Sequence, residues 1–207
     1  MKYELLGWHD DPGGGPRLRL DYRAFAYAGK FVTSSTGTAV ARDDADSWEL
    51  EAEADGPPQI GDPTVVGAVA FNEDRTDPQT LWLRYVTVRV DRRGEGVGPR
   101  LVSFVCDHAR ERGYARARIA VNNVFSYEAL SKVGFGYTGR ETGLAEVVLD
   151  RDLTTGPGVD REQYQRGLDV FRGRDLTGDE AAFLAARKGT DPPAATGLTT
   201  DDRADES

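Results

Sequence analysis

The stretch from Leu81 to Gly113 most constrains the fold, because it reads as a strand, a glycine-rich turn and a helix in direct succession. Apolar residues dominate the run from Leu81 to Val90, as in a strand. After the turn, apolar residues recur at the i, i+3, i+4, i+7 spacing of a helix face, at Leu101, Phe104, Val105 and His108. Gly113 suits the helix end. A strand followed at once by a helix predicts an α/β fold.

The flanking segments extend this pattern into a sheet. We expect a buried strand before the unit, then a strand, a short helix and two closing strands after it, at Val65–Phe71, Ala115–Val121, Phe125–Val133, Gly136–Arg140 and Leu144–Leu149. The alternation of strand and helix predicts a mixed twisted sheet flanked by helices, with parallel pairing in the middle. Strict alternation within the central strand places Leu81, Leu83 and Tyr85 on one face and Trp82, Arg84, Val86 and Val88 on the other.

The two ends of the chain are less regular. Alternation predicts a strand near Leu18 to Tyr22, whereas the segment from Tyr22 to Phe31 fits a strand or a helix equally well. Thr38–Arg42 and Ser47–Ala54 read as exposed strands, the second within an unusual insertion from residue 43 to residue 62.

The composition shifts after Asp150, where a Gly/Pro linker leads to two amphipathic helices, at 159–171 and 178–187. Thr177 and Glu180 form a predicted capping box. The expected organisation is a main α/β domain over residues 1–150, a helical extension over 151–188 and a disordered acidic tail over 189–207. Three roles are open for the two helices: covering the sheet, forming a homodimer, or closing over a ligand site.

Acidic residues dominate the charge of the chain. The formal net charge is -9, from 22 Asp and 13 Glu against 22 Arg and 4 Lys. Short hydrated carboxylates keep a surface soluble in concentrated salt, and the composition resembles that of proteins from extreme halophiles. An acidic surface that attracts cationic substrates is the alternative. The same charge argues against nucleic acid as a partner, because phosphate binding needs a basic face.

Other classes of protein are also disfavoured. No run of about 18 apolar residues exists, so we expect no membrane span, and the N-terminus lacks the apolar core of a signal peptide. The single Cys106 excludes an internal disulfide, and only two histidines are available for a metal site. We therefore expect a cytoplasmic protein without a metal. Cys106 itself reads as a small buried apolar residue.

The glycine-rich turn predicts a site for an anion. Residues 93–98 read Arg-Gly-Glu-Gly-Val-Gly, and backbone N–H groups there have no helical acceptor. Glycines allow positive φ and close approach of a ligand, so the turn is suited to a diphosphate at a helix N-terminus. An ordinary strand-to-helix turn is the alternative. Neither a nucleotide-triphosphatase loop nor the dinucleotide fingerprint matches, because the required Gly-Lys-Ser/Thr and Gly-x-Gly-x-x-Gly patterns are absent here.

The loop and a second motif together resemble the GNAT N-acetyltransferase superfamily. The run Arg93-Gly94-Glu95-Gly96-Val97-Gly98 matches the family's Arg/Gln-x-x-Gly-x-Gly/Ala loop, although Val90 stands where proline is frequent. Downstream, Asn122-Asn123, a short helix and Lys132-Val133-Gly134-Phe135 resemble the family's second signature. One helix and one strand separate the two motifs, as in the family, and the resemblance covers about residues 65–149.

This resemblance implies acetyl-CoA, or another acyl-CoA, as the acyl donor. It places the diphosphate on the amides of Arg93, Gly94, Glu95, Gly96, Val97 and Gly98. It also implies a bulged strand that splays from its neighbour and offers groups near Val88 and Val90 to the pantetheine arm. The Val88 amide would donate to the thioester oxygen, and Asn123 would face the arm, unless it is only a helix cap.

The catalytic groups depart from the family pattern. Family members often carry a tyrosine as general acid where this chain has Leu130, and Tyr127, one turn earlier, is the substitute that we predict. The strand before the loop has no carboxylate, so Glu73 is the predicted base, with Asp74 and Asp77 as alternatives in the same loop. A packing role for Tyr127 and a merely solvated role for the loop carboxylates are the competing interpretations.

The resemblance therefore implies an N-acetyltransferase that moves an acetyl group from acetyl-CoA to a primary amine by direct attack. The amine belongs to a small molecule or to a protein N-terminus or lysine. An acyl-CoA-binding sensor or interaction module with weak catalysis is the alternative, which the two missing catalytic groups favour. Trp82 and Tyr85 are candidates for lining the acceptor cleft, although a place in the strand core explains them equally well.

Overall fold

The computed structural model describes residues 1–12, 15–33, 36–45, 60–156 and 158–195. The strand predicted at Ser47–Ala54 lies outside the described residues, as does the predicted tail from residue 196 onward. In the part that is described, no helix is both long and apolar enough to span a bilayer.

Seven strands of the described chain form one mixed sheet in the order β1-β3-β5-β6-β7-β9-β8. Their bounds are β1 Lys2–Gly7, β3 Gly37–Arg42, β5 Val65–Glu73, β6 Thr80–Val88, β7 Arg116–Val121, β8 Gly136–Glu141 and β9 Val147–Asp152. Neighbouring strands are antiparallel except β6 and β7, which run parallel at the centre of the sheet. Two short strands, β2 at Leu18–Arg19 and β4 at Ile60–Gly61, pair separately and in parallel.

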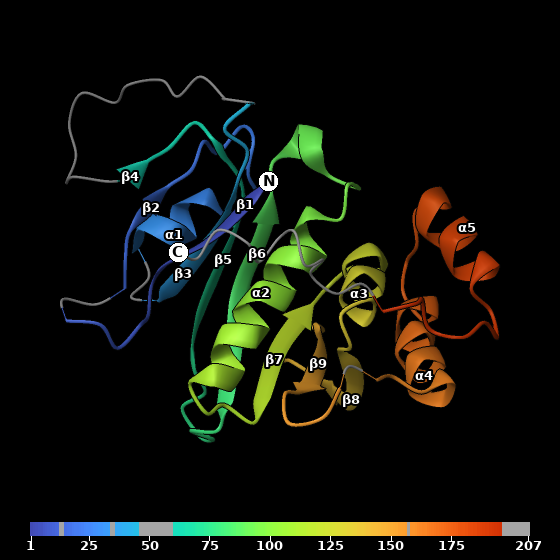
Figure 1. Cartoon of the computed structure of the whole chain (residues 1–207). Coiled ribbons are helices and arrows are strands. Elements are labelled where there is room, and N and C mark those ends of the chain that lie inside the picture. The colour runs from blue at the N-terminus through green and yellow to red at the C-terminus, as the bar shows by residue number, and fades with distance from the viewer. Residues whose placement is uncertain (13–14, 34–35, 46–59, 157, 196–207) are drawn as a thin grey trace.

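Helices cover both faces of this sheet (Figure 1). The long α2, at Val97–Glu111, crosses one face, and the short α1, at Ala28–Thr33, lies on the other beside β2. The remaining helices follow β7 and β9, at α3 Val124–Ser131, α4 Arg161–Arg172 and α5 Gly178–Ala186. A 3-10 turn, η1, at Val90–Arg92, links β6 to the loop before α2.

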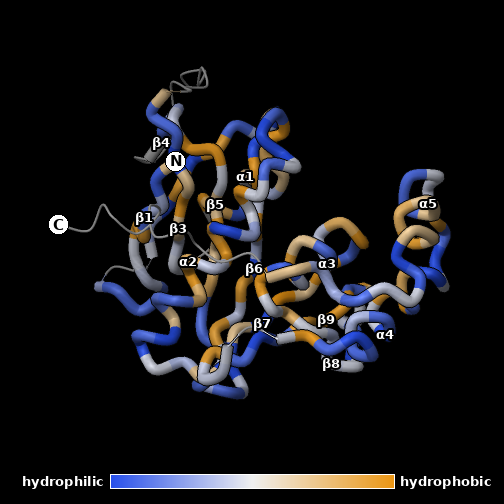
Figure 2. Tube along the Cα trace, turned by 45° about the vertical axis from the view of Figure 1, so that its right-hand side comes forward, coloured by the Kyte–Doolittle hydropathy of each residue, from blue (hydrophilic) through white to orange (hydrophobic). Residues whose placement is uncertain are grey.

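Two apolar clusters correspond to these two layers. The larger joins α2 and α3 to the sheet and includes Leu83, Leu101 and Phe135, which are fully buried. The smaller packs α1 and the chain before it on the opposite face, through Phe25 and Phe31. Apolar residues run along the central strands, whereas the connecting loops are largely hydrophilic (Figure 2). The α/β fold class predicted from the sequence is confirmed.

The N-terminal strands differ from the sequence prediction. β3 is buried along most of its length rather than exposed, because it lies between β1 and β5. β1 was not expected, since its sequence alone carries a weak strand signal, and the sheet edge supplies the pairing that orders it. The strand near Leu18 reaches only to Arg19, and the helical alternative for residues 22–31 is realised only from Ala28.

The central strand β6 also differs, because it carries a bulge. Ala70 and Phe71 of β5 are consecutive, yet they pair with Tyr85 and Leu83 of β6, so Arg84 is an extra residue. A bulge reverses the alternation of faces beyond it. As a result Val86 and Val88 pack with Leu81 and Leu83 on the α2 side, and Tyr85 faces the α1 side, contrary to strict alternation.

The two C-terminal helices pack on the same core. The chain leaves the sheet at Asp152, two residues beyond the predicted domain boundary, and α4 then lies against β8 and α3, with α5 beyond it (Figure 1). Tyr164 and Leu184 are buried in the larger cluster. The predicted capping box at Thr177 and Glu180 is confirmed. Of the three roles considered for these helices, the observed packing corresponds to covering the end of the sheet.

Candidate active site

The central parallel strands separate halfway along their length. β6 pairs with β7 from Thr80 to Leu83, opposite Arg116 to Ile119, and there the pairing ends although β6 continues to Val88. The separation opens a fork between the carboxyl ends of the two strands. Ligands of α/β sheets commonly bind where such neighbouring strands part.

One side of the fork presents backbone N–H groups of β6 that no neighbouring strand pairs, although the Val88 carbonyl accepts from Arg93 Nε over 3.3 Å. The N–H of Arg89 donates to the carbonyl of Val66 over 2.9 Å, so Arg89 turns its backbone toward β5. Alternation then turns the N–H groups of Val86 and Val88 toward the fork. Within the described chain, no strand pairs with β6 on that side beyond Leu83. Val90 differs, because its N–H donates to the carbonyl of Ala24 over 2.9 Å, so this amide is not available for the predicted pairing with a ligand.

The glycine loop follows at the open end of the fork. Gly94 and Gly96 have φ values of 86° and 78°, so both glycines adopt the left-handed conformation that the sequence predicted. Gly98 lies in the first turn of α2, where a Cβ would be 3.4 Å from the Val88 side chain. The glycines therefore bend the loop and also let α2 start close to β6.

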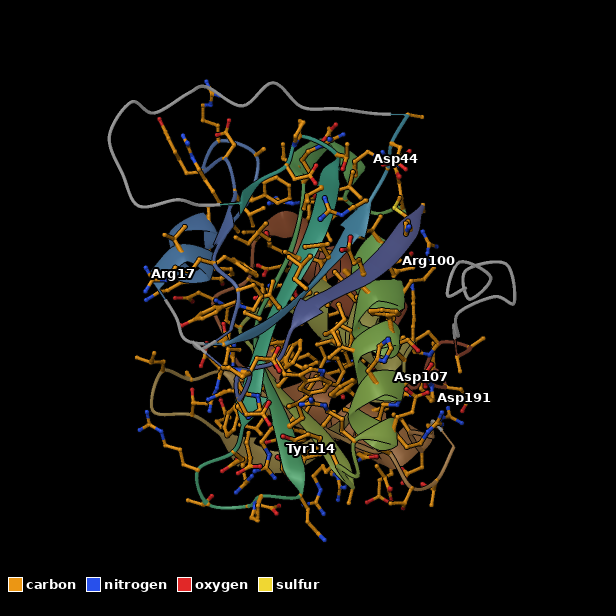
Figure 3. The ribbon with its side chains drawn as sticks, turned by 60° about the vertical axis from the view of Figure 1, so that its left-hand side comes forward. Arg17, Asp44, Arg100, Asp107, Tyr114 and Asp191 are labelled. Carbon is orange, nitrogen blue, oxygen red and sulfur yellow. The ribbon has the colours of Figure 1, made fainter. Side chains whose placement is uncertain are left out.

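The loop offers its amides to an anion. Across the described structure, the backbone N–H groups of residues 93–98 donate no well-formed hydrogen bond. The nearby carboxylate of Glu95 is bound by Arg92 over 2.9 Å, and Arg100 donates to the Glu95 carbonyl. Arg100 projects from α2 beside β1 (Figure 3), and Arg93 is exposed next to the loop. Unpaired amides at a helix N-terminus beside two arginines fit the diphosphate of coenzyme A.

A pocket opens on the opposite face of the sheet from α2, at the base of the fork. Its volume is about 760 Å³, which suits a small molecule. The lining comes from the residue before β3, the end of β5 and the loop after it, β6, β7, the end of β8 with the following turn, and β9. The residues are Thr36, Asn72, Asp74, Arg75, Thr76, Trp82, Arg84, Tyr85, Arg118, Arg140, Glu141, Thr142 and Val148. Trp82 and Tyr85 thus lie at the pocket, as the sequence suggested for an acceptor cleft.

Both carboxylates of the pocket are engaged by other groups. Asp74 Oδ2 accepts from Arg118 over 3.1 Å, and Asp74 Oδ1 accepts from the backbone and hydroxyl of Thr76. Burial opposes ionisation of Asp74, but these hydrogen bonds and the charge of Arg118 lower its pKa below the usual 3.8. Glu141 pairs with Arg174 over 3.2 Å. Neither carboxylate is placed as a free proton acceptor.

The two predicted catalytic side chains lie away from this pocket. Tyr127 is fully buried, and its hydroxyl donates to the carbonyl of Tyr164 on α4 over 3.0 Å. Burial raises the pKa of Tyr127 well above its ordinary value. Glu73 alternates with the pocket residues Asn72 and Asp74. Its backbone N–H donates to His9 Nε2 over 3.4 Å, and its carboxylate lies near Tyr114. The proposed roles of Tyr127 and Glu73 stay predictions, without support from their placement.

Asn123 is observed as a helix cap. Its Oδ1 accepts from the N–H of Ser126 over 2.8 Å at the start of α3, and its Nδ2 donates to the side chain of Asn122. The capping role is confirmed, and contact with the pantetheine arm stays a prediction.

Sequence reasoning missed the arginines of the pocket. Arg84 was assigned only to one face of its strand, and neither Arg75 nor Arg140 was singled out. One signal was present, since Arg84 interrupts an otherwise apolar strand next to Trp82. A charged residue within a central strand indicates a cavity or a site, because a packed core would leave its charge unsolvated.

Comparison with known proteins identifies a family. The model of the acetyltransferase (GNAT) family matches residues 18–135, more than half of the chain. No curated protein matches this sequence.

Several solved structures are similar at low identity. Nourseothricin acetyltransferase is 21% identical with a TM-score of 0.44, over 57% of this chain and 65% of that one, which is just under two thirds of its length. A GCN5-related N-acetyltransferase from Kribbella flavida is 19% identical with a TM-score of 0.45, over 70% and 72% of the two chains. An N-acetyltransferase from Staphylococcus aureus Mu50 is 18% identical with a TM-score of 0.44, over 57% and 68%.

Proposed function

Because the chain belongs to the acetyltransferase (GNAT) family, we propose that it moves an acetyl group from acetyl-CoA to a primary amine by direct attack of the amine. The observation that carries the proposal is the set of unpaired amides at residues 93–98, placed at the open end of the β6–β7 fork. When bound, acetyl-CoA supplies the acetyl group as an activated thioester. The fork connects the glycine loop with the pocket, so donor and acceptor would meet where β6 and β7 separate.

Residues of this chain account for binding and orientation. The amides of residues 93–98 would hold the diphosphate, with Arg93 and Arg100 adding positive charge. The backbone of Val86 and Val88 would pair with the pantetheine arm as an added strand. The N–H of Val88 would also donate to the thioester oxygen as charge develops on it. Holding both reactants in one geometry is the largest expected contribution to the rate.

Besides positioning of the two reactants, the reaction needs the amine in its deprotonated form. An ammonium with a pKa of about 10.4 loses its proton at neutral pH at a cost of about 4–5 kcal/mol. The pocket carboxylates Asp74 and Glu141 are both paired with arginines. Positive charge near an amine lowers its pKa. We therefore propose that the arginines of the pocket favour the neutral amine and that the proton leaves to water.

An acyl-CoA-binding module with weak catalysis is the second candidate. Its support is that neither Tyr127 nor Glu73 lines the pocket. Thiol release from acetyl-CoA over a panel of amines separates the two candidates, because tight binding without turnover supports the module.

A matched pair of glycine variants tests the diphosphate site. Gly94 and Gly113 have φ values of 86° and 89°, and a Cβ on either would meet no neighbour within 4 Å. Gly94→Asp and Gly113→Asp therefore introduce similar backbone strain and one new charge. We expect Gly94→Asp to weaken coenzyme A binding about tenfold or more by calorimetry, and Gly113→Asp to leave it unchanged.

Acetyl-pantetheine, which lacks the diphosphate, sharpens this comparison. Its turnover should be similar in Gly94→Asp and Gly113→Asp, since only the diphosphate would contact the loop. Equal coenzyme A affinity in the two variants would show that residues 93–98 do not hold the diphosphate and would remove the basis of the proposal.

A further inference from the structure

The arginines of the pocket point to the chemistry of the acceptor. Four arginines line it, at Arg75, Arg84, Arg118 and Arg140, against the two carboxylates of Asp74 and Glu141. This balance is opposite to that of the whole chain, whose net charge is -9. A cationic pocket in an acidic protein indicates that the pocket receives negative charge.

The charge of Arg118 is already balanced. It binds both oxygens of Asp150, over 2.7 Å and 2.8 Å, and also binds Asp74. Its side chain is only 11% exposed, so it forms the floor of the pocket rather than a free ligand. A fully paired arginine of this kind contributes little net attraction to an incoming anion.

The other three arginines differ from Arg118 in their partners. Among the described residues, no Asp or Glu forms an ion pair with Arg75, Arg84 or Arg140. By contrast, arginines elsewhere on the protein are widely paired, as Arg42 is with Glu4 and Arg112 with Asp10. Arg75 and Arg140 are exposed at the rim, from the β5–β6 loop and from β8.

Arg84 lies deepest of the three and is held in place. Its Nε donates to Asn72 Oδ1 over 2.6 Å, and its guanidinium lies 4.4 Å from the centre of the Trp82 ring. Partial burial lowers the pKa of Arg84, because the charged form loses hydration. Its terminal nitrogens make no hydrogen bond within the described structure. Because Nε is hydrogen-bonded and the guanidinium is stacked on a ring, the two terminal nitrogens of Arg84 are held in position to donate to a carboxylate or a phosphate.

We infer that the acceptor is a small amine that also carries an anionic group, a carboxylate or a phosphate, which Arg84 binds together with Arg75 and Arg140. This inference rests on the proposed acetyl transfer and specifies its substrate class. The volume of about 760 Å³ is ample for such a molecule. Arg84 is the extra residue of the bulge and directly follows Leu83, where the pairing of β6 with β7 ends and the fork opens. The anion would therefore be held beside the reacting amine. A polyamine is disfavoured, since it would bring further positive charge to this pocket.

Binding of matched compounds tests the inference. Calorimetry would measure the affinity of each compound for the full chain saturated with coenzyme A, at one fixed KCl concentration. One series compares linear amino acids with their amides. The other compares aminoalkyl phosphates with the parent aminoalkanols. Spermidine represents the cationic class. We expect at least one anionic compound to bind about tenfold or more tightly than its neutral partner, and spermidine to bind weakly. The carboxylate and phosphate series identify which anion is preferred.

Arginine variants connect the preference to the pocket. Arg84→Gln should reduce the advantage of the anionic compound about tenfold, whereas Arg110→Gln, an exposed position on α2 across the sheet, should leave it unchanged. Should Arg84→Gln not fold, the double variant Arg75→Gln/Arg140→Gln at the exposed rim provides the same comparison.

The inference is overturned if no anionic compound binds more tightly than its neutral partner, or if the preference persists in these variants. Failure of the proposed function is distinguishable, because it appears as loss of coenzyme A binding to the unmodified chain. Acetyl transfer that favours neutral amines or spermidine would leave the function in place and refute only the substrate class.

Discussion

Tyr127 illustrates at the scale of one residue how packing decides between two roles. Its ring lies over Gly167 of α4, where an added Cβ would meet the hydroxyl at 2.1 Å, so α4 approaches this closely only because residue 167 has no side chain. The hydroxyl is held by the Tyr164 carbonyl, and burial raises its pKa. A phenol held in this way anchors α4 to α3.

Tyr127→Phe should therefore affect stability more than catalysis. The variant keeps the ring but leaves the Tyr164 carbonyl without its donor, which should lower the free energy of unfolding by about 1–3 kcal/mol. We expect kcat to stay within about threefold of the unmodified chain. Urea denaturation and thiol release measure the two quantities. A loss of kcat of about a hundredfold with unchanged stability would instead establish Tyr127 as the general acid.

Cys106 gives a second prediction at this scale. It is buried on α2, and burial, partly offset by Arg151, raises the pKa of its thiol to about 12. Because the thiolate is the reactive form, almost none is present near pH 8. We expect Ellman's reagent to label the native chain negligibly and to label one thiol after denaturation in urea. Rapid labelling of the native chain would contradict the buried placement.

Two pairs of neighbouring residues show which features of the site can be predicted from the sequence and which cannot. The positive φ of Gly94 and Gly96 was predictable, because glycine has no Cβ and tolerates positive φ in any sequence context. Glu73, the last residue of β5, and Asp74 are adjacent acidic residues, yet only Asp74 lines the pocket. Which of them faces the pocket depends on the pairing of β5 with its neighbours, and the sequence of the loop does not contain that information.

At the scale of elements, the bulge at Arg84 explains why the faces of β6 were mispredicted while the strand itself was found. Apolar content reveals a strand, but a bulge arises from its pairing with β5, where Ala70 and Phe71 are consecutive. The same reasoning applies to β3, whose burial comes from its place between β1 and β5. Local motifs such as the glycine loop and the Thr177 capping box were predictable, because their contacts lie within a few residues.

The C-terminal extension also contacts the edge of the pocket, which yields a prediction at this scale. Arg174, after α4, binds Glu141, the carbonyl of Ala145 and the carbonyl of Asn122. Glu141 lines the pocket, so Arg174 fixes the β8–β9 turn that forms one wall. Arg174→Ala should raise the acceptor KM about threefold to tenfold, with coenzyme A affinity unchanged.

Arg166→Ala is the control for that experiment. Arg166 is exposed on α4 and, among the described residues, forms an ion pair only with Glu162 over 3.6 Å, so its removal should change neither KM nor coenzyme A affinity. Equal effects of the two variants on KM would show that the extension acts through general stability rather than through the turn.

At the scale of the whole molecule, the acidic charge sets the conditions under which the protein is stable. The net charge of -9 reflects 35 Asp and Glu against 26 Lys and Arg, and self-repulsion of a compact charged body opposes folding. The resemblance of the composition to halophilic proteins stays a prediction, but its physical consequence can be measured. Salt should stabilise the fold by screening this repulsion.

Thermal unfolding against salt tests this consequence. At about pH 7 we expect the melting temperature to rise by several degrees between about 0.1 M and 3 M KCl, because the Debye length falls from about 10 Å to below 3 Å. The same series near the isoelectric point of about 4.8 is the control, since the net charge is small there and screening should contribute little. A melting temperature that stays constant or falls with KCl at neutral pH would mean that the paired arginines already neutralise the surface. The excess of Asp over Lys would then need another explanation.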